Sequence, residues 1–386
     1  MKQAFKLAYR NLMGAGLRTW LNASVLAFTF ILILFYNGLM DGWNNQAKRD
    51  SIEWEYGQGH VINKDFDPLD PFTILDGHGS IKEFSDLDVT PVLLQQGTIY
   101  PEGRSITTLI KGVSSDQDIV ILPTEKLKNS SAEIPVIIGK YMSIKSGLKE
   151  GDEILLRWRD SEGTFDAANI TVVGIFESTV PAIDQGQIYM PIEKLWKLTG
   201  LDNQASMFIV GEDYTHNESS EWNFKGHEEL LANLNALIDT KKASGSIMYL
   251  LLMAIALLAI FDTQVLSIFR RQKEIGTYVA LGMTRDQVIR LFTVEGLMYS
   301  LLGVGLGIIV GTPLLYLLAK NGIPYPVENV QDLGIPISDT MYPVFSLGLI
   351  VTTLLLVVIS ATIVSYLPAR KISKMNPVDA IKGKLQ

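Results

Sequence analysis

The chain has 386 residues, of which 47% are hydrophobic and 19% are charged, and its mean hydropathy is +0.21. This composition is apolar enough for membrane spans but too polar for a chain that lies mostly in lipid, so we expect a few spans and a sizeable folded domain outside the bilayer. The net charge of −8 argues against a nucleic-acid partner, which requires a clustered basic face, and the lack of cysteine excludes disulfides and thiolate metal sites.

The first 40 residues predict an amphipathic helix followed by a membrane span. Residues 1–18 contain basic side chains and no acid, with apolar residues at helical spacing, which is typical of a helix on the inner face of a membrane. Residues 19–40 form an apolar run long enough to cross a hydrocarbon core of about 30 Å. A cleaved signal peptide is the alternative, but the run exceeds an h-region of about 7–15 residues, which favours an uncleaved anchor.

Residues 41–244 predict a folded α+β domain. Short segments rich in β-branched and aromatic residues are separated by Gly, Pro and Asp, and helical segments accompany them near residues 191–198 and 228–242. A stretch of about 200 residues is large enough to bury a core of its own.

Three further apolar runs predict membrane spans at residues 247–269, 291–318 and 343–367. Asp262 lies in the first of them. An ionisable group in a span indicates a polar partner or a water-filled path, and the alternatives are a position near the inner interface or a hydrogen bond to a neighbouring helix. In the second run, the spacing of three glycines predicts close helix packing, within the chain or against a partner chain: Gly303, Gly307 and Gly311.

Basic residues predict the orientation in the membrane. Segments 1–18, 270–290 and 368–386 are net basic, whereas the loop 319–342 is net acidic. By the positive-inside rule, both termini and segment 270–290 are cytoplasmic, and the domain 41–244 lies outside.

The residues give no sign of catalysis. The sequence has no G-x-x-x-x-G-K-[ST] loop to cradle nucleotide phosphates, and no nucleophile elbow or carboxylate pair that indicates hydrolysis. The four histidines share no metal-ligand spacing, and Asp65, Asp67 and Asp70 lack the glycine and the terminal glutamate of an EF-hand. We therefore expect no catalytic site, no metal and no cofactor in this chain.

Segment 270–290 joins two predicted spans on the inner side and carries the most distinctive pattern. Arg270, Arg271 and Lys273 suit a membrane interface, but Glu274 opposes the local positive bias and gains nothing from anionic lipid. In the first turn of a short helix, such a glutamate stabilises the N-terminus or pairs with a basic protein surface. Near the C-terminus, we expect Pro368 to end the last span.

Two groups of residues in these segments carry a family resemblance. The first is Arg271, Lys273, Glu274, Ile275, Gly276, Ala280, Leu281 and Gly282, and the second is Pro368, Ala369, Arg370, Asn376 and Pro377. Together they resemble the motifs of FtsX/MacB-type permeases, the membrane subunits of type VII ABC transporters. The resemblance implies that segment 270–290 is a coupling elbow, which seats in a groove of a separate cytoplasmic P-loop ATPase that binds the ATP and Mg²⁺.

The resemblance also implies a fold and a function. We expect a membrane α-helical protein with four transmembrane helices and a large inserted α+β extracytoplasmic domain, placed in the bacterial inner membrane beside a second permease chain, identical or homologous. Strand and turn patterns in the domain, such as Gly139-Lys140 and residues 172–176, look more similar to the lipoprotein-releasing LolC/LolE type. That similarity implies lipoprotein extraction, with a lipoprotein cargo or a periplasmic carrier or adaptor as a further partner. A MacB-like tripartite efflux permease and an FtsX-like transmitter that activates cell-wall hydrolases are the alternatives.

Overall fold

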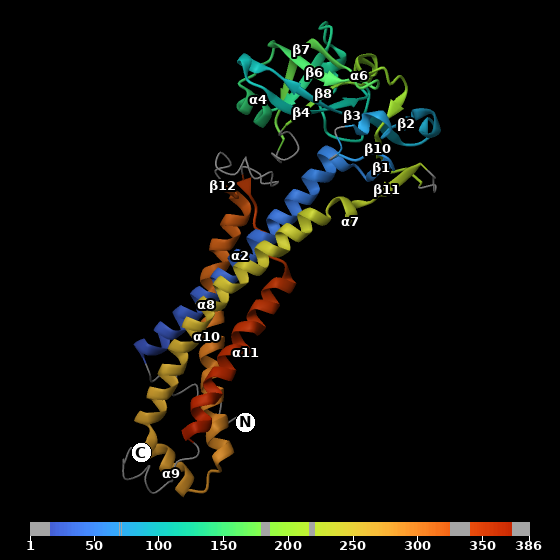
Figure 1. Ribbon diagram of the computed structural model, residues 1–386. Coiled ribbons are helices and arrows are strands. Elements are labelled where there is room, and N and C mark those ends of the chain that lie inside the picture. The colour runs from blue at the N-terminus through green and yellow to red at the C-terminus, as the bar shows by residue number, and fades with distance from the viewer. Residues whose placement is uncertain are drawn as a thin grey trace. The chain divides into compact units, whose positions relative to one another are not determined.

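The computed structural model describes residues 16–68, 70, 72–178, 186–215, 221–324 and 340–372 (Figure 1). Most of the predicted amphipathic helix 1–18, most of the loop 319–342, and the tail beyond residue 372 lie outside this description. The chain divides into two compact units. The first comprises Met1–Trp43, Ile238–Ile323 and Tyr342–Gln386, and the second comprises Asn44–Leu237 and Pro324–Met341.

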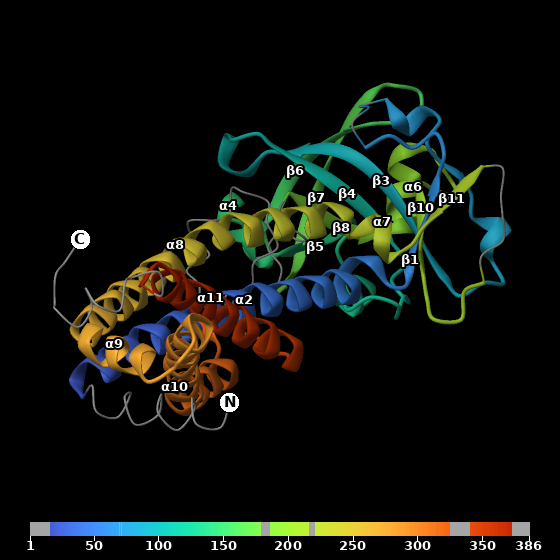
Figure 2. The same cartoon turned by 90° about the horizontal axis from the view of Figure 1, so that it is seen from below.

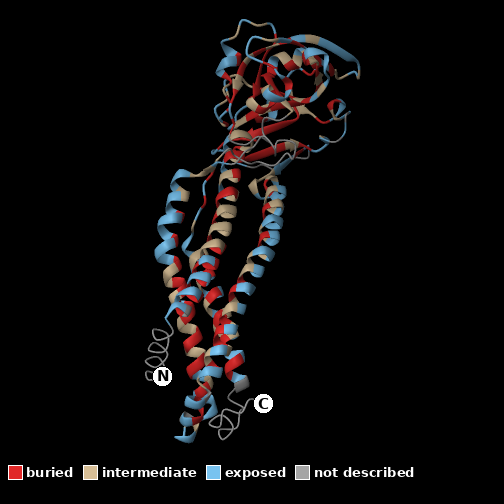
Figure 3. Cartoon of the chain, turned by 90° about the vertical axis from the view of Figure 1, so that its left-hand side faces the viewer, coloured by how far each residue is buried: buried red, intermediate tan, exposed pale blue. Residues whose placement is uncertain are grey.

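Four long helices supply the first unit: α2 (Leu17–Ser51), α8 (Ala232–Arg270), α10 (Arg285–Asn321) and α11 (Leu347–Ile372). Each contains a stretch long and apolar enough to cross a membrane. Figure 2 shows the four helices gathered side by side. All four contribute to one apolar core, which includes Leu26, Phe30, Ile260, Val304 and Ala361. Exposed residues, pale blue in Figure 3, follow the outward faces of these helices, and many of them are large and apolar, as lipid contact requires.

The helices are longer than the predicted spans. The first runs past residue 40 to Ser51, and α8 begins at Ala232 rather than at 247, so the unit boundaries fall inside these two helices. The start of α10 at Arg285 is fixed by a capping box, in which the backbone N–H of Gln287 donates to Thr284 Oγ1 and the backbone N–H of Thr284 donates to Gln287 Oε1. Helix length therefore follows caps and packing, whereas hydropathy locates only the apolar part.

The last helix does not end at Pro368, where the sequence predicts the end of the last span. Pro368 lies inside α11, which continues to Ile372. A proline removes one backbone donor and crowds the preceding turn, which usually kinks or ends a helix. Here Pro368 and Ala369 are both buried, so packing holds the final turn in place.

The second unit is built on a sheet that contains nine strands in the described part of the chain: β1 (Gly59–Asn63), β3 (Val89–Ile99), β4 (Ile106–Val113), β5 (Pro135–Gly139), β6 (Glu153–Arg159), β7 (Phe165–Phe176), β8 (Gln187–Pro191), β10 (Met207–Val210) and β11 (Trp222–Lys225). Their order is β11-β1-β10-β3-β4-β8-β5-β7-β6. The second half of the long strand β3 also pairs with β6, which closes the strands from β3 to β6 into a barrel. The pairs β4–β8 and β5–β7 are parallel, and the other pairs are antiparallel.

Short elements complete this unit. The helical ones are η1 (Ile52–Tyr56), η2 (Thr73–Leu75), η3 (Ile81–Phe84), η4 (Pro101–Gly103), α3 (Glu125–Lys128), α4 (Lys140–Ser146), α6 (Ile192–Thr199) and α7 (His227–Leu230). Two small pairs of strands join β2 (Gly79–Ser80) to β9 (Gln204–Ala205) and β12 (Ile323–Pro324) to β13 (Thr340–Met341).

The barrel has a continuous apolar core, in which Leu93, Ile110, Val136, Ile170 and Ile188 are fully buried. Helix α6 packs closely on β4, because a Cβ at Gly112 would lie 2.8 Å from Leu195 Cδ2. With the four apolar helices of the first unit, this sheet-rich domain confirms the predicted fold class.

A buried polar cluster lies where the π-helical turn η1 meets β4. Lys111 Nζ donates to Glu55 Oε1 at 2.7 Å and lies 5.6 Å from the centre of the Tyr189 ring. Burial disfavours the charged lysine, but the carboxylate of Glu55 outweighs this effect and raises the pKa of Lys111. His60 is 5% exposed, and its Nε2 donates to the Glu55 carbonyl oxygen at 3.0 Å. Burial lowers the pKa of His60 to about 4.

We predict that the second unit loses stability as the pH falls from about 6.5 towards 4, on the order of 3 kcal/mol from His60 alone. The unfolded chain binds a proton at His60 near pH 6.5, whereas the folded chain excludes it until about pH 4. Thermal unfolding of the full chain in lipid nanodiscs, followed by tryptophan fluorescence between pH 7.5 and 5, measures the effect.

The variant His60→Gln keeps a hydrogen-bond donor for the Glu55 carbonyl and removes the titrating group. Its midpoint temperature of thermal unfolding should therefore depend less on pH. The control His78→Gln alters a half-buried histidine that contacts Gln204, and it should keep the wild-type dependence. An unchanged dependence in His60→Gln would rule out this assignment.

Candidate functional site

A short helix turns the chain between two of the long helices at one end of the first unit. Helix α9 (Gln272–Ala280) follows Arg271, whose φ of −104° and ψ of 15° interrupt the helical path after α8. After α9, Gly282 has a φ of +100°, a backbone conformation that favours glycine, and the chain then enters α10. Figures 1 and 2 show α9 as this elbow between α8 and α10.

Arg271 links the elbow to α10. Its Nε donates to Glu274 Oε2 at 3.0 Å, and its Nη1 donates to Glu295 Oε2 at 3.2 Å. The guanidinium also lies 5.4 Å from the centre of the Phe292 ring. Glu295 is only 2% exposed, and a buried carboxylate is costly unless it is paired, so Arg271 compensates it.

The pairing of Glu295 was not predicted from the sequence. The signal that could have found it is an acid within the apolar run after residue 291, because such an acid requires a polar or basic partner. The partner could not be chosen by sequence alone, since Arg270 and Arg271 stand side by side at the end of α8.

The two faces of α9 differ in chemistry. Ile275 and Gly276 are buried, and Ile275 packs in a small cluster with Ile268, Val288, Phe292 and Ala369. The opposite face carries the exposed residues Lys273 and Glu274, and it continues into Ala280, Leu281 and Gly282, which are also exposed. Leu281 is 80% exposed although it is large and apolar. The exposed side of the elbow thus combines one basic and one acidic residue with an exposed apolar side chain, which is suitable for contact with another protein.

The structure brings part of the second motif to the same cluster. Ala369 on α11 is 1% exposed and packs in the cluster that contains Ile275, and Pro368 beside it is buried. Arg370 is exposed. Asn376 and Pro377 lie outside the described residues. Motifs almost a hundred residues apart in the sequence thus share one core beneath the exposed face of α9.

Asp262 does not lie in the interior of the first unit. Its side chain is exposed on α8, and it makes no hydrogen bond or ion pair with another residue that the structure describes. Since Arg270 is eight residues further on, Asp262 lies roughly 12 Å along the helix from the basic end of α8. The described part of the first unit thus supplies no hydrogen-bond or ion-pair partner for Asp262.

The three glycines of α10 face α2. A Cβ at Gly303 would lie 2.7 Å from Leu26 Cβ, one at Gly307 would lie 2.8 Å from Phe30 Cδ1, and one at Gly311 would lie 2.8 Å from Ile31 Cγ1. Contacts this short leave no room for a side chain, so these glycines permit close packing of α10 on α2 within the chain.

No group of three His, Asp or Glu side chains among the described residues could hold a metal ion. The described histidines take part in hydrogen bonds: His60 with the Glu55 carbonyl, His78 with Gln204, and His227 with the Gly57 carbonyl. His216 lies outside the described residues.

Comparisons with known proteins match this architecture. The FtsX-like permease C-terminal family matches residues 246–377, which include the elbow and the buried part of the second motif. LolC of Xylella fastidiosa (strain 9a5c), a lipoprotein-releasing system transmembrane protein, is 23% identical over 315 residues, which cover 72% of this chain and 74% of LolC. MacB of Burkholderia cenocepacia (strain HI2424), a macrolide export ATP-binding/permease protein, is 27% identical over 156 residues, 39% of this chain and 21% of MacB.

Among solved structures, the periplasmic region of MacB from Actinobacillus actinomycetemcomitans matches with a TM-score of 0.31 and 10% identity, covering 47% of this chain and 94% of that one. The family match spans the helices and the elbow that the site is built from, and the LolC match extends over most of both chains. The chain therefore contains an FtsX-like permease domain and is homologous to LolC and MacB.

Proposed function

We propose that this chain is the permease subunit of a transporter in the bacterial inner membrane, and that it transmits the ATP-driven motion of a separate ATPase to its extracytoplasmic domain to release lipoproteins. The observation that carries the proposal is the position of Arg271, which bonds at once to the exposed Glu274 and the buried Glu295. In this proposal the cytoplasmic ATPase, which binds ATP and Mg²⁺, seats on the exposed face of α9.

The contacts of α9 explain how a displacement there would spread. Ile275 packs with residues of α8, α10 and α11, so α9 cannot move without moving the ends of these helices. Helices α2 and α8 then continue without interruption past the unit boundaries at residues 43 and 238. Both termini and the elbow are cytoplasmic in this proposal, and the sheet-rich domain is outside.

The choice of lipoprotein release rests on LolC, which the match covers for 74% of its length. MacB-like efflux is the second candidate, because the elbow and the helices around it also match an export protein. A carrier or adaptor outside the membrane would be the further partner in either case. Depletion of this chain should retain lipoproteins in the inner membrane under the first candidate and leave their location unchanged under the second.

Reversing the charge of Glu274 should uncouple the two subunits. In Glu274→Arg, the exposed carboxylate that faces the ATPase is lost, and we expect the stimulation of ATPase activity by the permease to fall at least fivefold in reconstituted vesicles. The protein should still insert and fold.

The variant Glu274→Asp keeps the charge and serves as the matched control, with coupling near the wild-type level. Wild-type stimulation of ATPase activity in Glu274→Arg would contradict the assignment of α9 as the docking helix.

Removing Arg271 should destabilise the first unit. Arg271→Met removes this ion pair from the buried Glu295, at a cost of about 3–5 kcal/mol. The double variant Arg271→Met with Glu295→Met replaces the pair by apolar side chains and should recover most of the loss. Thermal unfolding in nanodiscs compares the stability of the wild type, both single variants and the double variant. Additive losses of stability in the double variant would contradict the pairing.

The second permease chain should contact the exposed face of α8. We expect an unpaired carboxylate at Asp262 to be covered by protein rather than by lipid, because a charge facing hydrocarbon is costly. A photo-crosslinking residue at Leu258, which is 63% exposed beside Asp262, should capture an identical or homologous permease in native membranes. The same residue at Ile260, which is 1% exposed, is the control. Capture of lipid alone at Leu258 would place the interface elsewhere.

A further inference from the structure

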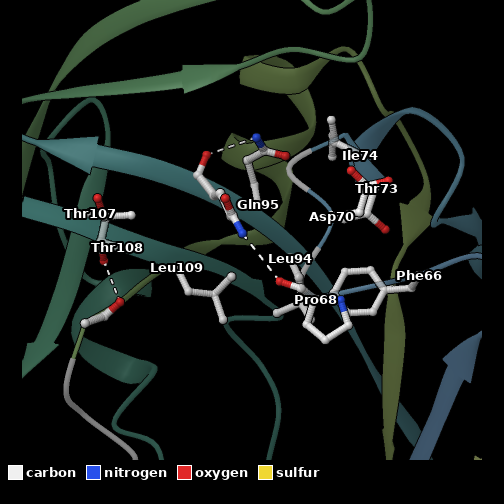
Figure 4. A pocket seen from close by; sticks show the side chains of 12 residues that line it. Phe66, Pro68, Asp70, Thr73, Ile74, Leu94, Gln95, Thr107, Thr108 and Leu109 are labelled. Atoms are coloured by element: carbon white, nitrogen blue, oxygen red, sulfur yellow. Dashed lines mark hydrogen bonds between the residues drawn. The ribbon is translucent and has the colours of Figure 1, made fainter.

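The second unit contains a pocket that the proposed function does not use. It lies between the loop that follows β1 and the neighbouring strands β3 and β4, and its volume is about 350 Å³ (Figure 4). Apolar side chains form most of its wall: Phe66, Pro68, Ile74, Leu94 and Leu109. A cavity of this size and lining suits a small organic molecule with an apolar body.

Gln95 supplies a buried acceptor at this pocket. The side chain is 4% exposed, and its Nε2 donates to the carbonyl oxygens of Gln96 and Arg159, each at 3.0 Å. These two carbonyls can only accept, so they fix which end of the amide is nitrogen. The other end, Oε1, is buried and has no hydrogen-bond partner among the described residues. In Figure 4 this oxygen is turned towards the side on which Ile74 and Asp70 lie.

An orphaned buried acceptor is rare in folded proteins and indicates a donor that is missing from the site. No described residue donates to it, although polar side chains also line the pocket: Thr73, Gln96, Thr107 and Thr108. An N–H or O–H donor on a ligand in the pocket would satisfy this oxygen.

The charge at the pocket decides which donor fits. Asp70 is the one ionisable side chain among the lining residues that the structure describes, and it is exposed. Its Oδ1 accepts the backbone N–H of Phe72 at 2.9 Å. The guanidinium of Arg159 does not neutralise it, because that group is directed at the Phe72 ring, 4.4 Å away, and at the Gly163 carbonyl, 2.7 Å away.

We propose that this pocket binds a small organic amine with an apolar body. A protonated amine has three N–H donors, enough for the orphaned oxygen of Gln95 and the carboxylate of Asp70 together. The apolar body then covers Phe66, Ile74 and Leu109. The charge of Asp70 repels a carboxylate of the same shape, and a neutral alcohol has a single O–H donor and no positive charge to pair with Asp70. The site stands independently of the cargo and of the ATPase.

The test uses the full chain in lipid nanodiscs and three water-soluble probes of similar shape: 2-phenylethylamine, 2-phenylethanol and 3-phenylpropanoate. Saturation-transfer NMR titrations, with empty nanodiscs as the blank, give the dissociation constants. The amine should bind saturably and at least tenfold more tightly than the other two probes.

Three variants locate the binding. Asp70→Asn should weaken amine binding at least tenfold, and Gln95→Leu should weaken it as well by removing the acceptor. Asp76→Asn changes an exposed acid of the same loop that does not line the pocket, and it should leave binding unchanged. Because Gln95 is buried, its variant is first compared with the wild type by thermal unfolding; Asp70 is exposed, so its variant decides the question if Gln95→Leu unfolds.

The proposal is overturned if the amine does not bind saturably, if 3-phenylpropanoate binds equally well, or if Asp70→Asn binds the amine like the wild type. Equal loss in Asp76→Asn would also overturn it, because it would show general attraction of a cation to an acidic loop rather than a defined pocket.

Discussion

A buried carboxylate on α10 determines how the elbow of this protein is built. Glu295 is 2% exposed in an apolar helix, and a charge in such surroundings requires a partner. Arg271 provides it, and to do so the residue must stand where α8 ends and its side chain must turn back towards α10. The direction of α9 follows from this pair, and with it the exposure of Glu274 and the burial of Ile275.

Close packing holds the rest of the first unit together. Helices in lipid gain little from the hydrophobic effect, because the surrounding tails are as apolar as their own side chains. Their association depends on short contacts, and Gly303, Gly307 and Gly311 supply these between α10 and α2. Gly296 does the same between α10 and α11, because a Cβ there would overlap the side chain of Ser365. The helix that carries Glu295 is thus held on two sides, so a displacement of the elbow passes to its neighbours.

The second unit shows how differently buried polar groups can be used. Lys111 Nζ and Glu55 Oε1 form an ion pair at 2.7 Å, which links the turn η1 to β4. In Gln95, only the amide nitrogen forms hydrogen bonds. The amide oxygen lies beside a pocket and has no hydrogen-bond partner among the described residues. In the first unit, Gln264 is 1% exposed and neither atom of its amide has a described hydrogen-bond partner. Groups of the first kind stabilise one structure, whereas groups of the second kind mark where a ligand or another conformation could supply the missing contact.

The sequence by itself determined the fold class, because hydropathy over a span and the alternation of strands and turns are local properties. It also singled out the segment around Glu274, because an acid just after a basic pair is visible without any structure. The tertiary structure decided what depends on residues far apart: the closure of the barrel by β3 and β6, the pairing of Arg271 with Glu295 rather than with lipid, and the exposure of Asp262. It also decided that α11 continues through Pro368, since packing outweighed the local preference of proline. Such outcomes require contacts between segments, and no local pattern encodes which segments meet.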